Sequence, residues 1–168
     1  MSKLIKNGNI INDEWKTLNL AEDNTPDSVK LPVGPVLVPL SVWKARRTEL
    51  MHREYEHGWP LGVWLSAEES AEAIAQDIDD FTVIALKFDK YSDGQSYSTA
   101  RVLREHYGYK GELRAIGDVS GDNLTYQHQV GFDAFAVQPN QKTENVLSGI
   151  FSFTGSRRQR QQYSALVS

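Results

Sequence analysis

Short apolar runs alternate with amphipathic segments along most of the chain. Five of the apolar runs are bounded by turn residues, which is typical of β-strands, and they span residues 36–40, 61–65, 81–88, 112–117 and 132–137. The run FTVIALKF at 81–88 is apolar on both of its faces, as expected at the centre of a parallel sheet. The pattern therefore predicts a sheet of about five strands.

The segments between these runs have helical patterns. Ser41 is placed to cap a helix that extends to about Glu56, and Ser66 with Glu69 forms a capping box, which predicts a helix to about Ile78. Further helices are predicted from Ser96 to Gly108, over 123–130 and within 141–152. Strands that alternate with helices indicate an α/β fold with a parallel sheet, and both an open sheet and a half-barrel fit this order.

Three regions lie outside this alternation. Residues 1–18 are predicted to form an N-terminal β-hairpin, because KLIK and NIIN flank Asn7-Gly8, the pair favoured in type I′ turns, and Trp15 is expected to cover one face. Residues 19–35 are polar and rich in proline, which is typical of a linker or surface loop. We expect the α/β domain over 36–152 and a polar, basic tail over 153–168.

Composition narrows the classes of function. The 168 residues include no cysteine, which excludes disulfides, thiolate metal sites, cysteine-ligated iron–sulfur clusters and thiol redox chemistry by this chain. A net charge of −4 argues against a general nucleic-acid binder. The chain has no secretory signal at its start and no apolar stretch of about 18 residues, so we expect a cytoplasmic protein without a membrane partner.

No cofactor or metal can be assigned from motifs. The sequence contains neither the GxGxxG of dinucleotide-binding strands nor a Walker A loop, so the cofactor stays unknown. The four histidines lack the spacing of metal ligands, so no metal site is expected.

Two strand-end loops carry candidate chemistry, because sites in parallel α/β sheets lie at the carboxyl ends of strands. Lys87 ends the third predicted strand and Asp118 follows the fourth. A lysine beside an aspartate at neighbouring strand ends can act as an acid–base pair, and a desolvated lysine can form a Schiff base. A structural ion pair between Lys87 and Asp118 is the other interpretation.

The segment that follows Lys87 is a candidate anion site. Ser96 is the expected helix cap, and Tyr97 and Ser98 lie in the first helical turn, whose free N–H groups attract anions. Arg101 lies four residues after Tyr97, on the same helical face. Phosphate, sulfate or sulfite are ligands of suitable chemistry, although ordinary helix capping explains the same residues.

Several blocks resemble a bacterial family of unknown function whose members are often labelled oxidoreductases involved in sulfite reduction. The most specific blocks are IALKFDKYSDGQSYSTARVLRE at 84–105 and YGYKGELRAIGDV at 107–119. Shorter similarities lie at 34–43, 59–65 and 130–137, and the hairpin also looks like the start of that family. The resemblance implies a role in sulfur metabolism and brings no established site residue.

Three functions follow as alternatives. The first is an accessory protein of assimilatory sulfite reduction that binds a small oxyanion or a sulfite reductase component. The second is a lyase- or isomerase-like enzyme that uses Lys87 and Asp118. The third is a non-catalytic interaction module that dimerises, as a homo-oligomer, or docks on a partner through its last helix and tail.

Overall fold

The computed structural model describes residues 2–89, 94–119, 128 and 130–137. The strands are β1 Lys3–Lys6, β2 Asn9–Asn12, β3 Lys16–Thr17, β4 Val36–Pro39, β5 Leu61–Leu65, β6 Val83–Phe88, β7 Glu112–Gly117 and β8 Ala134–Ala136. The helical elements are α1 Leu40–His57, the 3₁₀ turns η1 Ala71–Ile74 and η2 Ile78–Asp80, α2 Gln95–Arg101 and the π-helical turn η3 Val102–His106. The predicted helices over 123–130 and 141–152 and the tail at 153–168 lie outside the described residues, apart from His128 and Val130.

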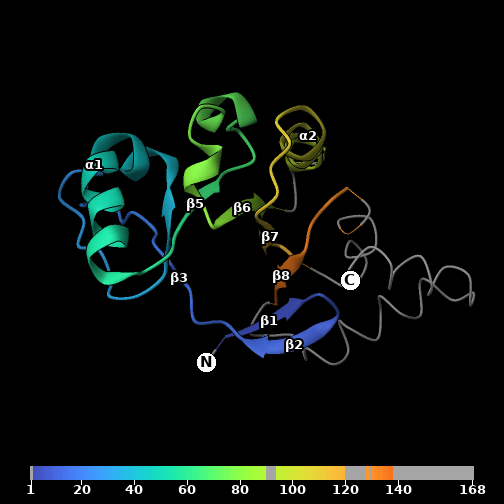
Figure 1. Cartoon of the computed structure of the whole chain (residues 1–168), viewed down its shortest axis with the longest axis horizontal. Coiled ribbons are helices and arrows are strands. Elements are labelled where there is room, and N and C mark those ends of the chain that lie inside the picture. The colour runs from blue at the N-terminus through green and yellow to red at the C-terminus, as the bar shows by residue number, and fades with distance from the viewer. Residues whose placement is uncertain (1, 90–93, 120–127, 129, 138–168) are drawn as a thin grey trace, which may run out of the picture.

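All strands of the described region belong to one eight-stranded sheet, in the order β2-β1-β8-β7-β6-β5-β4-β3. The strands from β3 to β8 are parallel, and each pairs with the next one along the chain. In a (β/α) barrel, each strand lies beside the next one along the chain, whereas a doubly wound sheet changes direction part-way. The observed strand order is therefore that of a partial (β/α) barrel. The α/β class is confirmed, and the half-barrel is the arrangement that the chain adopts (Figure 1).

The N-terminal hairpin is confirmed, and it changes the character of the sheet. Asn7 and Gly8 have φ values of 51° and 78°, the positive pair that a type I′ turn requires. β1 pairs antiparallel with both β2 and β8, so the hairpin is built into the sheet. The predicted all-parallel sheet of about five strands is therefore wrong: the sheet is mixed and has eight strands. The hairpin pattern shows that two strands pair with each other, and it carries no signal of where the pair will dock.

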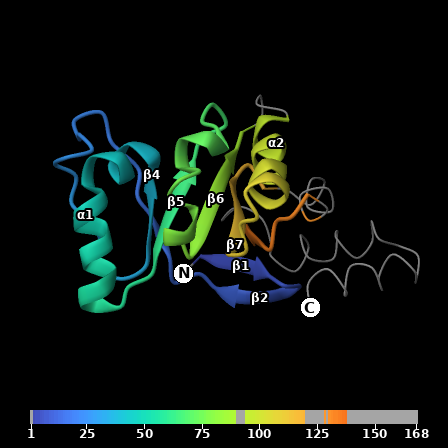
Figure 2. The same cartoon turned by 45° about the horizontal axis from the view of Figure 1, so that its top comes forward.

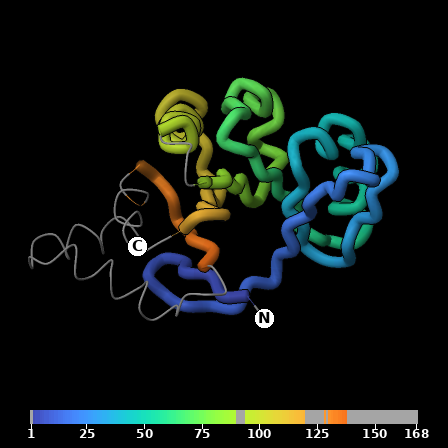
Figure 3. The backbone as a smooth tube through the Cα atoms, turned by 180° about the vertical axis from the view of Figure 1, so that it is seen from behind, coloured from blue at the N-terminus to red at the C-terminus, as the bar shows by residue number. Residues whose placement is uncertain are grey.

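A short connection forces the sheet to curl. Only residues 13–15 separate β2 from β3, so the α-carbons of Asn12 and Lys16 lie at most about 14 Å apart. These two strands are the opposite ends of the eight-stranded sheet, which would be roughly 34 Å apart in a flat sheet with a spacing of about 4.8 Å. The N-terminal trace accordingly passes from the hairpin to the side of the molecule that carries α1 (Figure 3).

One of the predicted helices is wrong. The predicted α-helix from Ser66 to Ile78 is replaced by η1 and η2, although the Ser66 N–H donates to Glu69 Oε1 at 2.8 Å, as half of a capping box would. The carboxylate of Asp77 accepts from Trp43 Nε1 at 3.2 Å and from Arg47 at 2.6 Å. This tertiary contact holds the segment in 3₁₀ turns against its local preference for a longer helix.

The caps of the two α-helices also differ from expectation. α1 begins one residue before Ser41, with Pro39 in the N-cap position. α2 has Gly94 as its N-cap, at a φ of 87°, so Ser96 lies inside the first turn. The hydroxyl of Ser96 instead donates to the carbonyl of Lys87 at 3.1 Å, which ties the start of α2 to the end of β6.

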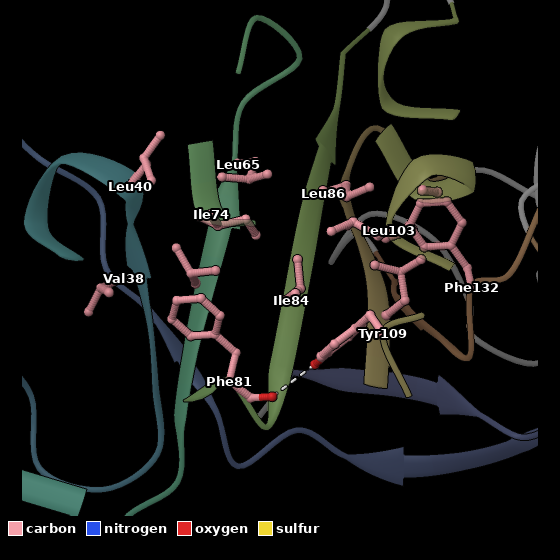
Figure 4. Close-up of a cluster of buried hydrophobic side chains, with 14 of the residues drawn as sticks. Val38, Leu40, Leu65, Ile74, Phe81, Ile84, Leu86, Leu103, Tyr109 and Phe132 are labelled. Carbon is pink, nitrogen blue, oxygen red and sulfur yellow. Dashed lines mark hydrogen bonds between the residues drawn. The ribbon is translucent and has the colours of Figure 1, made fainter. Parts of the chain in front are cut away.

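The main hydrophobic core lies between the convex face of the sheet and the helical elements, which follow one another along that face (Figures 1 and 2). Alternate residues of the strands, such as Val38, Leu65 and Ile84, point into this core (Figure 4). The hydroxyl of Tyr109 lies in the same core and donates to the carbonyl of Phe81 at 3.0 Å. Burial raises the pKa of Tyr109, because the phenolate would lose its hydration there.

The concave face holds a second, smaller cluster made of Leu37, Val83, Ala85 and Ile116, with Trp15 and Trp64 packed against it. A Cβ on Gly62 would lie 3.0 Å from the Trp15 ring, 2.6 Å from Leu37 and 2.8 Å from the Val83 carbonyl. Glycine at this position therefore makes room for Trp15 inside the curve of the sheet. Trp15 was expected to cover one face of the hairpin; it packs instead against the concave face of the large sheet.

Candidate functional site

The first candidate site is a hollow beside the start of α2. Gly94, Tyr97, Ser98 and Arg101 line it, and its volume is about 380 Å³. α2 follows β6 along the chain, so the start of α2 and these residues lie toward the carboxyl edge of the sheet, where sites in barrels of this type lie. Three of the four residues predicted to bind an anion thus share one surface hollow.

The side chains around the hollow have different roles. Ser98 and Arg101 are exposed, so the Ser98 hydroxyl and the Arg101 guanidinium can reach a solute. Tyr97 is half-buried, and its ring tilts against Phe88 with 5.0 Å between the ring centres. This contact fixes the position of Tyr97 as one wall of the hollow.

Ser96 is the fourth residue of the predicted anion site, and it does not line the hollow in the way expected. Its side chain is 2% exposed and its hydroxyl proton is given to the Lys87 carbonyl. Ser96 therefore positions the first turn of α2, and of the four predicted residues only Tyr97, Ser98 and Arg101 line the hollow.

Lys87 and Asp118 lie at adjacent strand ends, as predicted, and among the described residues no ion pair joins them. Lys87 is exposed, and its ammonium lies 5.3 Å from the centre of the Trp64 ring. The Asp118 N–H donates to the Phe88 carbonyl at 2.8 Å. Gly117, at a φ of 85°, turns the backbone between Ile116 and Asp118, which interrupts the strand geometry that would place both side chains on one face.

The surroundings of Lys87 bear on the Schiff-base hypothesis. A nucleophilic lysine has to be neutral, which proteins achieve by removing the ammonium from water. The Lys87 ammonium is instead exposed and lies over the Trp64 ring. The geometry gives the Lys87 and Asp118 chemistry no added support, and the catalytic roles of both residues stay predictions.

A second group of charges lies inside the half-barrel, and the sequence did not assign it. Arg114 is 2% exposed; its Nε donates to Glu112 Oε2 at 2.7 Å and its Nη1 to Asp13 Oδ1 at 3.0 Å. Lys6 Nζ lies 2.8 Å from the other oxygen of Glu112. Arg114 lies inside β7, and the structure places it in a buried ion network.

A third arginine, Arg104, holds the opposite edge of the sheet together. Its guanidinium donates to the carbonyls of Tyr109 and Gly111 at 2.7 and 2.8 Å and to that of Gly131 at 3.0 Å. It also donates to Asp133 Oδ2 at 2.6 Å. These partners precede β7 and β8, so Arg104 joins two loops at the amino edge of the sheet.

The described residues contain no group of three or more metal-ligating side chains, and no helix among them is long and apolar enough to cross a membrane.

Comparison with known families identifies the chain as far as its family. The family model of DUF934, described as a bacterial protein of unknown function, matches residues 62–165, which is more than half of the chain. The chain belongs to this family. No curated protein matches it. The predicted resemblance to a bacterial family of unknown function is thereby confirmed, and the DUF934 description names no reaction, substrate or partner. The match covers β5 to β8 together with α2, and therefore the four described residues that line the hollow.

Proposed function

We propose that this DUF934 protein is an accessory protein of assimilatory sulfur metabolism that binds a small oxyanion in the hollow beside α2. The observation that carries the proposal is the hollow itself, which gathers Tyr97, Ser98 and Arg101 around a volume of about 380 Å³. A guanidinium presents planar N–H donors that suit a sulfur or phosphorus oxyanion, and a hydroxyl adds a neutral hydrogen bond.

Three further features support this proposal. The hollow opens at the carboxyl edge of the parallel strands, the edge that carries the sites of related barrels. α2 continues without a break into η3, so the first turn of α2 begins a helical segment that extends to His106, and Gly94, the N-cap of this segment, lines the hollow. The absence of cysteine favours an accessory role over reduction of the anion by this chain.

Sulfite is the proposed anion, because the blocks at 84–105 and 107–119 resemble proteins labelled with sulfite reduction. A sulfite reductase component is the proposed partner, and the cytoplasm is the proposed compartment. Homo-oligomer formation and a lyase-like reaction at Lys87 stay alternative predictions.

Thermal stabilisation tests the anion site. Sulfite at millimolar concentration is expected to raise the Tm of the wild-type protein by a few degrees, since a ligand that binds only the folded state stabilises it. The Arg101→Ala variant is expected to lose most of this increase, while Lys110→Ala, which removes another exposed cation, keeps it. Equal increases in the wild-type and Arg101→Ala proteins would exclude the hollow as the binding site.

A deletion strain tests the role in the cell. Loss of the gene is expected to slow growth on sulfate as the only sulfur source, with normal growth on cysteine and reduced sulfite reductase activity in extracts. Complementation with the Arg101→Ala variant should fail if the hollow carries the function. Equal growth on both sulfur sources, with unchanged reductase activity, would refute the sulfur assignment.

A further inference from the structure

The half-barrel encloses a cation that the proposed function does not use. Arg114 lies in the middle of β7 and is 2% exposed. It shares a row of the sheet with Ala85 and Ala134, whose small side chains leave room for the guanidinium on the concave face. Burial of a charge in an apolar interior is tolerated only with a partner of opposite charge, so the partners of Arg114 decide whether this interior is stable.

One of these partners belongs to a different part of the chain. We call residues 13–18 the N-terminal arm, since they lead from β2 to β3 and just beyond it. Asp13 Oδ1 accepts from Arg114 Nη1 and also from the Trp15 N–H, both at 3.0 Å. The Trp15 ring lies 5.7 Å from the Arg114 guanidinium. The arm thus brings a carboxylate and an aromatic ring to Arg114.

The arm is attached to the rest of the sheet by the parallel pairing of β3 with β4, by the Asp13 N–H, which donates to the Ser2 carbonyl at 2.9 Å, and by a small number of other polar contacts. Backbone N–H groups of Lys16 and Leu18 donate to the carbonyls of Pro35 and Leu37, and Trp64 Nε1 donates to the Leu18 carbonyl at 2.9 Å. Glu14, Lys16 and Thr17 are exposed. The contact between Asp13 and Arg114, with a side chain of Asp13 that is only 11% exposed, is the most buried polar attachment of the arm to β7.

The charges of the interior balance only while the arm is in place. Lys6 and Arg114 are positive, and Glu112 and Asp13 are negative. Withdrawal of Asp13 would leave Arg114 to share Glu112 with Lys6, and because the Lys6 side chain is 42% exposed, the unfavourable loss of a partner falls on the buried Arg114. The arm can therefore leave Arg114 at low cost only if another anion takes the position of its carboxylate.

We propose that the Arg114 guanidinium is an anion-binding position inside the half-barrel and that Asp13 occupies it as an internal competitor. A small carboxylate or sulfur oxyanion binds Arg114 by displacing Asp13, and this exchange releases the N-terminal arm. The position is separate from the hollow beside α2, so each can exist without the other.

Amide hydrogen exchange of the arm, measured in the full-length protein, tests whether an added anion displaces Asp13 from Arg114. Acetate or sulfite at 20 mM is expected to raise the exchange of the Trp15 and Leu18 amides about tenfold over sodium chloride of equal ionic strength. The Arg114→Met variant, whose side chain has similar length and no charge, is expected to show no such increase. A response to both anions assigns the position to carboxylates in general, and a response to sulfite alone assigns it to sulfur oxyanions.

Two neighbouring acids provide matched variants. Asp13→Asn keeps an oxygen acceptor for the Trp15 N–H and removes only the charge, so the arm is expected to exchange roughly tenfold faster and to respond to about tenfold less anion. Glu14→Gln makes the same charge change at an exposed residue and is expected to behave as the wild type.

The proposal is overturned if neither anion accelerates exchange of the arm in the wild type, or if chloride accelerates it equally. The measurement on the wild-type protein is sufficient for this test even if the Asp13→Asn variant does not fold. Because Arg101→Ala should leave the response of the arm intact, failure of the hollow and failure of the Arg114 position are distinguishable.

Discussion

The cationic side chains at the two edges of the parallel sheet differ in their surroundings. At the amino edge, the four hydrogen bonds of Arg104 go to three loop carbonyls and to Asp133. At the carboxyl edge, Arg101 is exposed beside the hollow, and Lys87 is exposed over Trp64. Arg101 and Arg104 lie only three residues apart, on α2 and on the π-helical turn that continues it.

This difference separates stability from binding. Guanidinium N–H groups that are bonded to loop carbonyls hold strands together and are not available to a solute. Donors at the surface contribute little to folding and can meet an anion at low cost. The same division is found in complete (β/α) barrels, whose amino edge serves stability and whose carboxyl edge carries the active site.

The largest effect on stability is expected from a substitution at the amino edge. Arg104→Met removes the donors for three carbonyls and the partner of Asp133, and it should lower the free energy of unfolding by about 3 kcal/mol in urea denaturation. Arg101→Met on the same helical segment should change it by less than about 0.5 kcal/mol. Similar losses in the two variants would remove the distinction between the edges.

The next effect concerns the concave face. Gly62→Ala places a methyl group within 3.0 Å of Leu37, the Val83 carbonyl and the Trp15 ring, and the carbonyl belongs to a paired strand that cannot move freely. We expect a loss of about 2 kcal/mol in the free energy of unfolding, measured by urea denaturation. If this variant is as stable as the wild type, the close packing of Trp15 and Leu37 around Gly62 is not as the structure indicates.

A smaller effect is expected from the phenol at the amino edge. Tyr109→Phe leaves the carbonyl of Phe81 without its donor and should cost about 1 kcal/mol at neutral pH. Tyr55→Phe, at a side chain that is 89% exposed, is the matched control and should change stability very little.

The pH dependence of stability sharpens the same prediction. The pKa of Tyr109 is raised in the folded protein, so the folded state binds this proton more tightly than the unfolded chain. Its contribution is fully present below the unfolded pKa of about 10 and is lost as the pH rises above that value. Denaturation between pH 9 and 11 should therefore show a steeper loss in the wild type than in Tyr109→Phe, and equal slopes would contradict the assignment.

The smallest effect is expected at the carboxyl edge. Lys87→Met removes the ammonium over Trp64 and should lower the free energy of unfolding by about 0.5 kcal/mol. The fluorescence of Trp64 should change as the cation leaves its ring. A loss above 2 kcal/mol would mean that Lys87 holds the edge together as Arg104 does.

The sequence predicted the strands better than their assembly. The five apolar runs all contain strands of the parallel sheet, because runs that are buried on both faces leave a strong local signal. The docking of the hairpin on β8 leaves no local signal in the sequence, because it depends on contacts between residues more than a hundred positions apart, such as Ile5 and Phe135. The curl of the sheet is nevertheless implied by the three residues between β2 and β3 once the strand order is known.

The candidate site was predictable only in part. Tyr97, Ser98 and Arg101 come together because they share one helical face, which spacing alone reveals. Ser96 was misjudged because its hydroxyl bonds to the Lys87 carbonyl, a contact that local capping rules do not include. The partners of Arg114 come from Glu112 nearby and from Asp13 at the other end of the chain, and no local pattern signals the second.

The most direct test locates the anion on the protein. Titration of sulfite into ¹⁵N-labelled protein should shift the backbone resonances of Gly94, Tyr97, Ser98 and Arg101, the residues of the hollow. Arg101→Ala should abolish the shifts at the hollow and leave any shifts near Arg114 in place. Shifts that are absent from the hollow in the wild type, or that persist there in Arg101→Ala, would contradict the account.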